Sequence, residues 1–378
     1  MKKKVILGLS GGVDSSVAAI RLIEQGYEVE GMFMRNWDSS LNNDVLGNPT
    51  INDDVCPEER DYMDAVSVGK KLGIKVHRVD FIDEYWNRVF KYFIDEYKAG
   101  RTPNPDVMCN KEIKFKAFLD AALKLDADYI AMGHYAQVSH ENGVTRLLRA
   151  VDTNKDQTYF LCLLKEEQLS RALFPIGDIV KPEVRRIAEE YNLVTAKKKD
   201  STGICFIGER RFHEFLKNYI PSKPGNMETI DGKFVSKHDG LMYYTIGQRK
   251  GLNIGGNNQF ENKPWFVVGK SLERNVLIVS QDEHDPLLKS NRVIVRDYNF
   301  IHDIPVAGKE YQAKFRYRQP DTKVFINIID DKTIEVTYDK SYAVTPGQVC
   351  CLYDGEVCLG GGIIDSVYLD SEPRGFFK

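Results

Sequence analysis

The sequence predicts an α/β domain with a doubly wound parallel sheet, followed by a small β-rich module and a C-terminal β-barrel. Up to about residue 208, short apolar runs alternate with segments of helical periodicity, which is typical of repeated strand–helix units. Beyond that point, short alternating segments are separated by Gly, Asp and Asn about every ten residues, a pattern typical of all-β domains. We therefore expect three domains, at residues 1–208, 209–282 and 283–378.

The elements of the α/β domain can be placed in order. An apolar, partly β-branched run at residues 5–9 predicts a first strand, and apolar residues at helical spacing after it predict a helix that stops at Gly26. Further strands are expected at residues 29–34, at residues 74–80 and in a run that ends at Gly133. Helices are expected before Gly73 and, with aromatic residues on one face, over residues 83–100.

The C-terminal part of the chain contains the segments expected to form the barrel. They are NRVIVRDYNFI, QAKFRYRQP, TKVFINIID, TIEVTYD and GQVCCLYDGEVCLGGGIID. Each alternates apolar and polar residues and is bounded by turn-forming residues, which is the pattern of a half-buried strand.

The composition is that of a protein whose cysteines stay reduced. Seven cysteines, an odd number in a chain of 378 residues, argue against a disulfide framework. No apolar run approaches the length that spans a membrane, and Ser10 cuts the apolar opening too short for a signal peptide. The formal net charge is −3, so a nucleic-acid substrate would need a local basic patch. These features predict a cytoplasmic protein without a membrane partner.

A loop of small polar residues joins the first strand to the first helix. It consists of Gly8, Leu9, Ser10, Gly11, Gly12, Val13, Asp14 and Ser15. Unpaired N–H groups and the positive end of the helix dipole make such a position an anion site, and glycine lets the backbone approach the anion closely. The lysine of a Walker A loop and the third glycine of a dinucleotide fingerprint are both missing. The loop is therefore predicted to bind phosphate by another arrangement, unless it is an ordinary capped turn.

Two residues at neighbouring strand ends are candidates for nucleotide contact. Met34 and Gly133 each stand at the end of a predicted strand. Because the carboxyl ends of parallel strands meet at one edge of the sheet, both residues should lie beside the phosphate loop. Either residue could equally serve packing alone, so both interpretations stay open.

Two cysteines stand in surroundings that suit chemistry. Cys109 follows the run 104–106, Asn-Pro-Asp, just before a predicted helix. A thiolate is stabilised at such a position, and Asp106 could act there as an acid or base. Cys205 follows a polar stretch and the lysines of residues 197–199, which could be solvated, lower the pKa of a thiol or meet phosphates. Cys109 alone could be a buried structural thiol, but the two cysteines together favour thiol chemistry.

Seven segments carry a resemblance to a known family. They are SGGVDSS, NPDVMCNKEIKF, MGHYA, KDQTYFL, DSTGICFIGER, YTIGQRKGL and FRYRQ, in this order across nearly the whole chain. The first resembles the PP-loop of the ATP pyrophosphatase superfamily, and together they resemble the tRNA-specific 2-thiouridylases. The resemblance implies an adenine-nucleotide α-hydrolase-like fold. It also implies an enzyme that replaces O2 of the wobble uridine with sulfur in glutamate, glutamine and lysine tRNAs.

The resemblance also implies a division of roles. ATP would be bound by the loop of residues 8–15, and Asp14 would help to hold Mg²⁺. Cys205 would carry sulfur as a persulfide, Cys109 would be the nucleophile that closes a disulfide with it, and Asp106 would serve as acid and base. A cysteine desulfurase or a sulfur-relay protein would supply the sulfur.

The tRNA contacts implied by the family fall in a few short stretches. They are Asn104, Pro105 and Asp106 at the base, Lys155, Asp156 and Gln157 on the tRNA, His134 and Gln348 nearby, and Arg316 and Tyr317 in the barrel. Arg316 and Tyr317 also lie in a stretch that interleaves basic residues with an aromatic one, which suits RNA. His134 taken alone could be a hydrogen-bonded histidine at a strand end.

Three other functions remain open from the sequence. Another PP-loop enzyme, such as an amide-forming synthetase that activates a small carbonyl, would share the loop but have no need of Cys109 and Cys205. An iron–sulfur-dependent thiolase would need three or more clustered cysteines, whereas Cys350, Cys351 and Cys358 lie in strand-like sequence and suit barrel packing. A non-catalytic RNA-binding protein would not require an intact phosphate loop.

Overall fold

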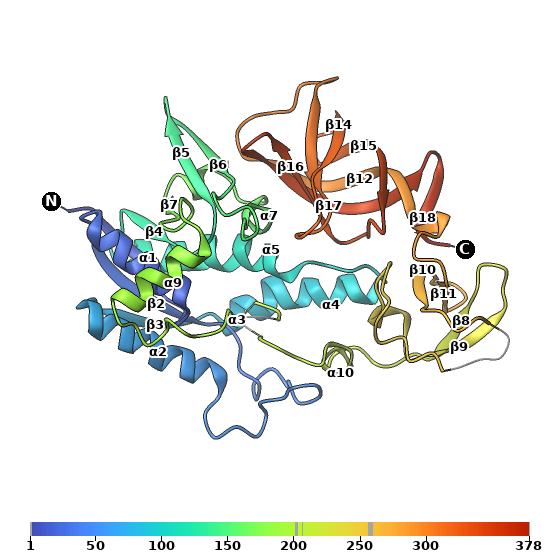
Figure 1. Cartoon of the computed structure of the whole chain (residues 1–378), viewed down its shortest axis with the longest axis horizontal. Coiled ribbons are helices and arrows are strands. Elements are labelled where there is room, and N and C mark those ends of the chain that lie inside the picture. The colour runs from blue at the N-terminus through green and yellow to red at the C-terminus, as the bar shows by residue number, and fades with distance from the viewer. Residues whose placement is uncertain (1, 201–202, 206, 256–259, 378) are drawn as a thin grey trace.

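A five-stranded parallel sheet forms the centre of the N-terminal domain in the computed structural model, which describes residues 2–200, 203–205, 207–255 and 260–377 (Figure 1). Its strands are β1 (Lys4–Gly8), β2 (Glu28–Arg35), β3 (Val76–Asp80), β4 (Tyr129–Ala131) and β7 (Ala172–Leu173). Their order is β3-β2-β1-β4-β7, and neighbouring strands are parallel. Strands β1, β2 and β4 therefore end at one edge of the sheet, as the sequence predicts.

Helices cover both faces of this sheet. One face packs through Val5 and Leu7 of β1 against α1 (Val13–Glu24), α2 (Pro57–Leu72) and α9 (Lys181–Glu190). The other face, which contains Ile6, packs against α3 (Ile82–Tyr85), η1 (Trp86–Phe90), α4 (Lys91–Lys98), α5 (Pro105–Cys109), η2 (Asn110–Ala117) and α6 (Phe118–Leu123). Alternate residues of β1 thus serve two helical layers, and the doubly wound fold is confirmed.

Helix α5 begins earlier than the sequence predicts. The side chain of Asn104 accepts hydrogen bonds from the backbone N–H groups of Asp106 and Val107, at 3.2 and 3.3 Å, and Pro105 occupies the first helical position. Both features favour the start of a helix, so the expectation that Cys109 precedes the helix is wrong. Cys109 lies inside α5 and is fully buried.

The C-terminal region forms a closed six-stranded antiparallel barrel. Its strands are β12 (Lys289–Phe300), β13 (Glu310–Lys314), β14 (Thr322–Ile328), β15 (Thr333–Tyr342), β16 (Val349–Asp354) and β17 (Val357–Leu369). They follow the order β12-β15-β14-β13-β16-β17, and pairing of β12 with β17 closes the barrel. Apolar side chains from every strand fill its interior, and the predicted barrel is confirmed.

The central module contains β8 (Gly225–Glu228), β9 (Phe234–His238), β10 (Phe266–Ser271) and β11 (Val276–Ser280). The last strand, β18 (Glu372–Phe376), pairs with β17 of the barrel and with β10 of the central module. The chain end therefore joins the two β-rich domains, which lie beside each other in Figure 1.

A hairpin of the N-terminal domain reaches the barrel from the other side. Its strands are β5 (Gln137–Glu141) and β6 (Val144–Leu148), and β6 pairs with β17. The remaining short elements are α7 (Thr158–Leu161), α8 (Glu166–Leu169), α10 (Phe212–Lys217), η3 (Leu241–Tyr243) and η4 (Pro286–Leu288). Within the described residues, none of the helices combines the length and apolar character needed to cross a membrane.

Candidate active site

The predicted phosphate loop follows β1 and leads directly into α1. Gly12 is the N-cap of α1, and among the described residues no side chain caps this helix end, so its first backbone N–H groups can face a ligand. The Ser10 and Ser15 hydroxyls lie 3.2 Å apart. The Ser15 and Ser16 hydroxyls donate to the Gly12 carbonyl at 3.2 and 2.7 Å. A loop braced in this way at a helix start fits a phosphate group.

Met34 and Gly133 both lie beside this loop. A Cβ atom at Gly133 would lie 2.8 Å from the Ser15 backbone nitrogen, so glycine is needed where the chain after β4 meets the start of α1. Met34 is buried, and its methyl group would lie 3.4 Å from a Cβ atom at Gly8. Packing explains both residues, and their contact with a nucleotide stays a prediction.

Gly11→Ala is expected to disrupt the loop. Gly11 has φ +72°, and a Cβ atom there would lie 2.1 Å from the carbonyl oxygen of Asp61 in α2. The left-handed conformation alone costs alanine about 1–2 kcal/mol, and the collision displaces the loop or α2. Calorimetry should show a lower unfolding temperature and loss of ATP binding. Gly26→Ala is the matched control, because Gly26 has φ +88° but no described atom within 4 Å of an added Cβ. Equal losses in both variants would contradict this account.

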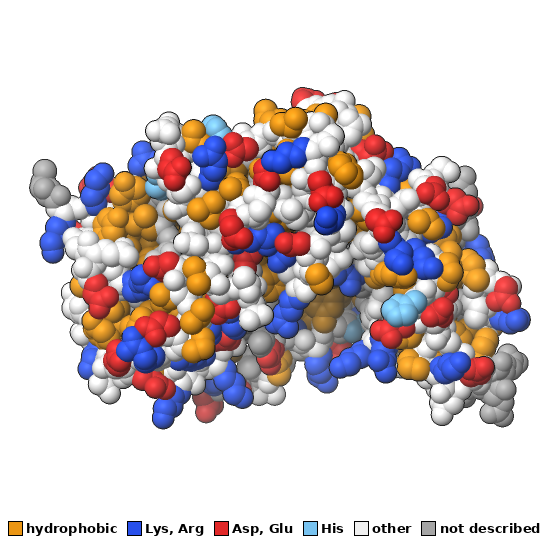
Figure 2. Space-filling model, turned by 45° about the horizontal axis from the view of Figure 1, so that its top comes forward, with side chains coloured by type: hydrophobic (Ala, Val, Ile, Leu, Met, Phe, Trp, Pro, Cys, Tyr) orange, Lys and Arg blue, Asp and Glu red, His pale blue; other side chains and the backbone are white. Residues whose placement is uncertain are grey.

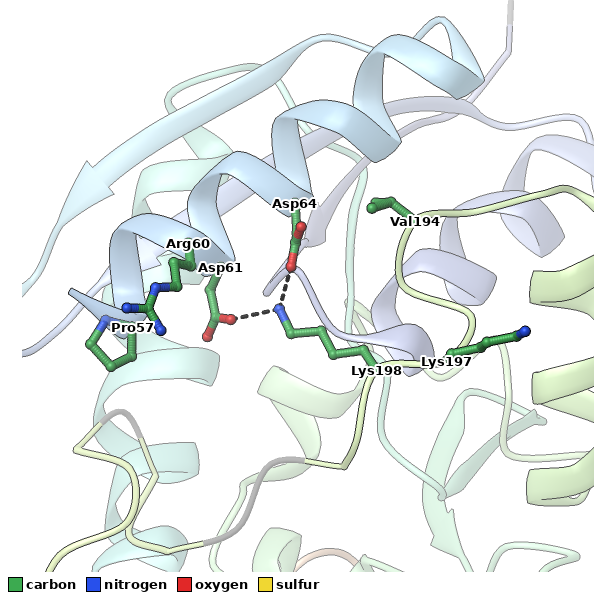
Figure 3. Close-up of a pocket in the computed structure, with 7 residues that line it drawn as sticks. All are labelled: Pro57, Arg60, Asp61, Asp64, Val194, Lys197 and Lys198. Carbon is green, nitrogen blue, oxygen red and sulfur yellow. Dashed lines mark hydrogen bonds and ion pairs between the residues drawn. The ribbon is translucent and has the colours of Figure 1, made fainter. Parts of the chain in front are cut away.

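Lys198 connects the phosphate loop to α2. Its ammonium nitrogen lies 2.8 Å from the Gly11 carbonyl oxygen. It also lies 2.6 Å from a carboxylate oxygen of each of Asp61 and Asp64 (Figure 3). The sequence left three roles open for the lysines of residues 197–199. The structure uses the middle one to hold the backbone of the loop in place.

Three cations converge on Asp200 next to the loop. Lys155, Lys181 and Arg185 each have a nitrogen 2.8 Å from a carboxylate oxygen of Asp200. Lys181, the first residue of α9, also lies 2.7 Å from Asp14 in the loop. A helix start and lysine ammonium groups both attract phosphate, so this corner can extend the phosphate site. Sequence reasoning missed Lys181 and Arg185, whose only signal is their place in the first turns of a helix.

Asp14 already accepts hydrogen bonds from the protein. The Tyr135 hydroxyl donates to it at 2.9 Å, and the Lys181 ammonium lies 2.7 and 2.9 Å from its two oxygens. The described residues contain no group of three or more His, Cys, Asp or Glu side chains arranged to hold a metal ion. Magnesium binding by Asp14 therefore stays a prediction, in which phosphate oxygens and waters supply the other ligands.

The two predicted cysteines meet in the structure. The sulfur atoms of Cys109 and Cys205 lie 3.6 Å apart, and both are free thiols. A carboxylate oxygen of Asp106 accepts a hydrogen bond from the Cys205 backbone N–H at 2.9 Å. The Tyr85 hydroxyl donates to the Cys205 carbonyl at 2.9 Å. Cys109 is buried, whereas Cys205 is partly exposed as a residue.

Electrostatics distinguish the two thiols. The pKa of Cys205 is lowered, first because the Cys109 thiol donates a hydrogen bond to it and also because the Lys114 ammonium is close, and these effects exceed desolvation. Burial raises the pKa of Cys109 well above its ordinary value. Burial also raises the pKa of Asp106, against the hydrogen bond from Cys205, which lowers it. Cys205 is therefore the more acidic thiol of the pair, and Asp106 is suited to exchange protons.

Lys114 is a site residue that sequence reasoning missed. It lies in η2, a π-helical segment whose i→i+5 hydrogen bonds bring residues five positions apart onto one face. Lys114 thereby shares the side of Cys109, and its ammonium interacts with both thiols and with Asp106. In a regular α-helix, residues three and four apart share a face and those five apart do not. The spacing of Lys114 from Cys109 in the sequence consequently did not indicate that the two side chains lie close together.

Lys114→Met is expected to make Cys205 less reactive at neutral pH. Loss of the ammonium removes one group that lowers the thiol pKa, so the thiolate forms only at higher pH. The rate at which iodoacetamide alkylates Cys205 is measured against pH by site-resolved mass spectrometry. The pH at which this rate rises should be higher by about 1 unit in the variant. Lys116→Met is the matched control, because Lys116 is exposed and pairs with Glu112 at 2.9 Å. An unchanged profile in Lys114→Met would show that Lys114 does not stabilise the thiolate.

Three family models match successive parts of this chain. Residues 3–209 match a family model described as the tRNA methyl transferase HUP domain. Residues 213–281 match its PRC-barrel domain, and residues 290–364 match an aminomethyltransferase beta-barrel domain. A protein of Acholeplasma laidlawii named tRNA-specific 2-thiouridylase MnmA is 60% identical over 375 residues, which cover 99% of each chain. The chain belongs to the tRNA-specific 2-thiouridylase family.

Further relatives with the same name are similar over the same length. Those of Mesoplasma florum and Shewanella oneidensis are 57% and 55% identical over 97% of this chain and over 100% and 96% of their own. A solved 4-thiouridine synthetase in complex with RNA and ATP superposes on 55% of this chain and 46% of its own, with 15% identity and a TM-score of 0.33. That likeness is too distant to support an argument. Ser201, Thr202 and Phe206, in the 2-thiouridylase motif around Cys205, lie outside the described residues.

His134, which the 2-thiouridylase resemblance assigns to tRNA, is buried after β4. Its ring lies beside those of Phe115 and Phe174, with centroids 6.1 Å away in both cases. Burial lowers the pKa of His134 well below its ordinary value, so the ring is neutral. Its Nδ1 atom has no hydrogen-bond partner in the described part of the chain. The alternative of a hydrogen-bonded histidine leaves this atom unexplained, whereas a ligand could satisfy it.

Two other residues assigned to tRNA bind the protein itself. The Gln157 side-chain oxygen accepts a hydrogen bond from the Tyr135 N–H at 2.9 Å. The buried Asp156 carboxylate accepts from the Ala150 N–H at 3.0 Å and from the Thr158 hydroxyl at 2.8 Å. Both side chains therefore shape the turn before α7, and their contact with tRNA stays a prediction.

The assigned residues of the barrel lie where domains meet. Arg316 donates to the Ile246 carbonyl of the central module at 2.9 Å, and the Gln348 amide donates to the Thr102 carbonyl of the N-terminal domain at 2.7 Å. The Tyr317 ring is half-buried against an aromatic residue of α7. These contacts connect the barrel to both other domains, and tRNA contact by the three residues stays a prediction.

The remaining barrel cysteines pack as the sequence predicts. Cys350, Cys351 and Cys358 are buried in β16 and β17, and the sulfur atoms of the last two lie 3.7 Å apart. Described residues offer no cysteine group arranged to hold a metal ion.

Proposed function

We propose that this protein is a tRNA-uridine 2-sulfurtransferase that converts the wobble uridine of glutamate, glutamine and lysine tRNAs to 2-thiouridine. The observation that carries the proposal is the pair of sulfur atoms 3.6 Å apart in the same domain as the phosphate loop. An amide-forming synthetase has a use for the loop but none for two converging thiols. Membership of the 2-thiouridylase family supports tRNA as the substrate.

In the first step, ATP activates the base. Backbone N–H groups at the start of α1 hold the phosphates, the C2 oxygen of the uridine attacks the α-phosphorus, and pyrophosphate leaves. The oxygen that must depart from C2 is then part of AMP, which is a good leaving group. Lys181 pairs with Asp14 in the loop, and Lys155 pairs with Asp200 next to the loop. Both ammonium groups therefore lie where they can bind the phosphates as well. Mg²⁺ on the phosphates, with Asp14 nearby, would neutralise their charge.

In the second step, the thiol pair delivers sulfur. A donor protein loads an outer sulfur onto the Cys205 thiolate, and this terminal sulfur attacks C2 as AMP leaves. Cys109 then attacks the inner sulfur of Cys205. The bond between the two persulfide sulfurs breaks, its electron pair goes to the outer sulfur that stays on the base, and the cysteines close a disulfide. A dithiol reductant supplies the two electrons that restore both thiols, and Asp106 exchanges protons beside them.

RNA binding is proposed for the face shown in Figure 2. Lys and Arg side chains line much of a hollow in the middle of this face, among some Asp and Glu side chains, and these basic groups support phosphate binding despite the net charge of −3. The target uridine must leave its stack to reach both ATP and the thiols. The proposed contacts are Asn104, Pro105 and Asp106 with the base, and His134, Lys155, Asp156, Gln157, Arg316, Tyr317 and Gln348 with the tRNA.

The sulfur donor and the compartment follow from the thiol chemistry. Cys205 must receive sulfane sulfur, and a cysteine desulfurase or a sulfur-relay protein carries it in that form. A cycle that ends in a disulfide between Cys109 and Cys205 needs a reducing environment, so we place the reaction in the cytoplasm.

Nucleoside mass spectrometry tests the proposed function. Unmodified glutamate tRNA is incubated with the protein, ATP, Mg²⁺ and a persulfide source. The expected product is 2-thiouridine, with one AMP and one pyrophosphate for each modified base. A transcript with cytidine at the wobble position is the matched control and should stay unmodified. If ATP is cleaved and no thiolated base forms, the substrate is wrong and the amide-forming synthetase becomes the better interpretation.

A further inference from the structure

The segment of residues 100–103, here called the connector, lies between α4 and α5 and is held by both β-rich domains. It begins with Gly100, at φ +78°, which follows the C-cap residue Ala99 of α4, and it leads into the Asn104 cap of α5. Thr102 in its middle is buried. The connector therefore sits immediately before the residues proposed to act on the base.

The central module holds the connector through Lys270 of β10. The Lys270 ammonium is buried, with 1% of the residue exposed, and donates to the Gly100 carbonyl at 2.7 Å. Leu272 packs against Gly100 so closely that a Cβ atom there would lie 2.8 Å from its side chain. Thr245 adds a contact between its hydroxyl and that of Thr102 at 3.2 Å.

A lysine at this depth is costly. Burial alone lowers the pKa of Lys270 to about 7, which records how poorly the charged form is solvated there. An apolar side chain of similar length would fill the same space without that cost. Packing stability consequently does not account for a lysine at this position, whereas the hydrogen bond to Gly100 does.

The barrel holds the other half of the connector. The Gln348 amide donates to the Thr102 carbonyl at 2.7 Å and to the Pro103 carbonyl at 3.3 Å. The Thr102 N–H in turn donates to the Pro346 carbonyl at 2.9 Å. The carbonyl groups of Gly100, Thr102 and Pro103 are thus all fixed by side chains from other domains.

What the connector controls is the placement of the thiol site. Asn104 follows it directly and caps α5, and α5 carries both Asp106 and Cys109. Asp106 in turn binds the Cys205 backbone, and Cys109 meets the Cys205 sulfur at 3.6 Å. A shift of the connector would therefore move Asp106 and Cys109 together relative to Cys205.

We propose that Lys270 and Gln348 are positioning residues, which fix the connector from the central module and from the barrel and thereby align Asp106 and Cys109 with Cys205. The consequence for turnover rests on the proposed sulfurtransferase function, while the alignment of the thiols does not. The central module and the barrel, of which the proposed function gives tRNA contacts only to the barrel, thus complete the geometry of the site in the N-terminal domain.

Lys270→Met is the first test, because it keeps the buried volume and removes the hydrogen bond to Gly100. The expected result is an unfolding temperature equal to or above that of the wild type, with kcat for thiolation lower by on the order of tenfold and KM for tRNA unchanged. The alkylation rate of Cys205 by iodoacetamide is measured against pH without tRNA or ATP. The rise in this rate should occur at higher pH in the variant, because a displaced Cys109 no longer stabilises the thiolate. Lys237→Met, at an exposed lysine of β9, is the matched control and should change nothing.

Several outcomes separate positioning from other roles. A wild-type alkylation profile and kcat in folded Lys270→Met would overturn the proposal for Lys270. If Lys270→Met fails to fold, Thr245→Val, which removes another hydrogen bond to the connector, is measured by the same two assays and decides in the same way. An alkylation profile equal to that of the wild type together with normal thiolation in Thr245→Val would also overturn it. If neither wild type nor variants thiolate tRNA while the alkylation shift is present, the proposed function fails and the positioning role stands.

Gln348 requires a separate comparison, because the proposed function also gives it a tRNA contact. Gln348→Leu cannot donate to the Thr102 and Pro103 carbonyls, so positioning predicts a lower kcat and the same upward shift in Cys205 alkylation. A pure tRNA contact predicts a higher KM with an unchanged alkylation profile in the absence of tRNA. That second result would overturn the positioning role of Gln348.

Discussion

Cys205→Ser is expected to abolish 2-thiouridine formation, by at least about a thousandfold, while leaving activation of the tRNA by ATP intact. Serine cannot carry a persulfide, so no sulfur reaches the activated base. The phosphate loop lies on a different element from Cys205 and keeps its bracing hydrogen bonds between Ser10, Ser15 and Gly12. The two half-reactions should therefore separate in this variant.

The measurement combines nucleoside mass spectrometry with the release of pyrophosphate. In Cys205→Ser, pyrophosphate should appear in about one equivalent per tRNA and then stop, since the adenylated base is not consumed. Cys56→Ser is the matched control, because Cys56 is exposed and lies outside the thiol pair. Normal thiolation in Cys205→Ser would show that another residue carries the sulfur, and loss of pyrophosphate release would show that Cys205 acts before sulfur transfer.

The elements of the fold could be predicted from local patterns. Val5, Ile6 and Leu7 are all fully buried, because the strand has an apolar layer on each face. Gly73 ends α2 with φ +70°, as a helix-terminating glycine does. The aromatic residues of 83–100 turn one face to the core, as the helical period predicts. The hydrophobic periodicity of a strand or helix and the residue that ends it depend only on residues close together in the chain, so the sequence alone reveals them.

The candidate site could be predicted only where chemistry is concentrated in a short motif. The phosphate loop and both cysteines stand in such motifs. Lys114 was not predicted, because its contact with the thiols depends on a π-helical turn. Lys181 was not predicted, because the fold brings α9 to the loop from far along the chain. Sequence reasoning also gave Gln348 a single role in tRNA binding, since its bond to the connector exists only once the domains are packed.

Asp106→Asn is expected to lower thiolation by about 10²–10⁴-fold while leaving the thiol pair in place. The asparagine oxygen can still accept the hydrogen bond from the Cys205 N–H, which spans 2.9 Å in the wild type. The Asn104 cap and α5 are unchanged, so the variant removes the exchangeable proton and the negative charge without removing the contact. Because the Asp106 carboxylate raises the pKa of Cys205, its loss should leave Cys205 alkylation as fast as in the wild type or faster.

The pH dependence supplies the decisive measurement for Asp106. Burial raises the pKa of this carboxyl above its ordinary value of 3.8, so a carboxylate acting as a base loses activity as the pH falls through that raised pKa. The thiolation rate of the wild type should therefore decrease at acidic pH, which we call the acidic limb. Asp106→Asn should have a low rate that lacks this decrease. Asp83→Asn, at an exposed aspartate of α3, should keep both the rate and the limb. A normal rate in Asp106→Asn would mean that the carboxyl only holds the Cys205 backbone, and slow alkylation of Cys205 would mean that the substitution displaced the thiols. Only a slow turnover with intact thiol reactivity assigns the proton transfer to Asp106.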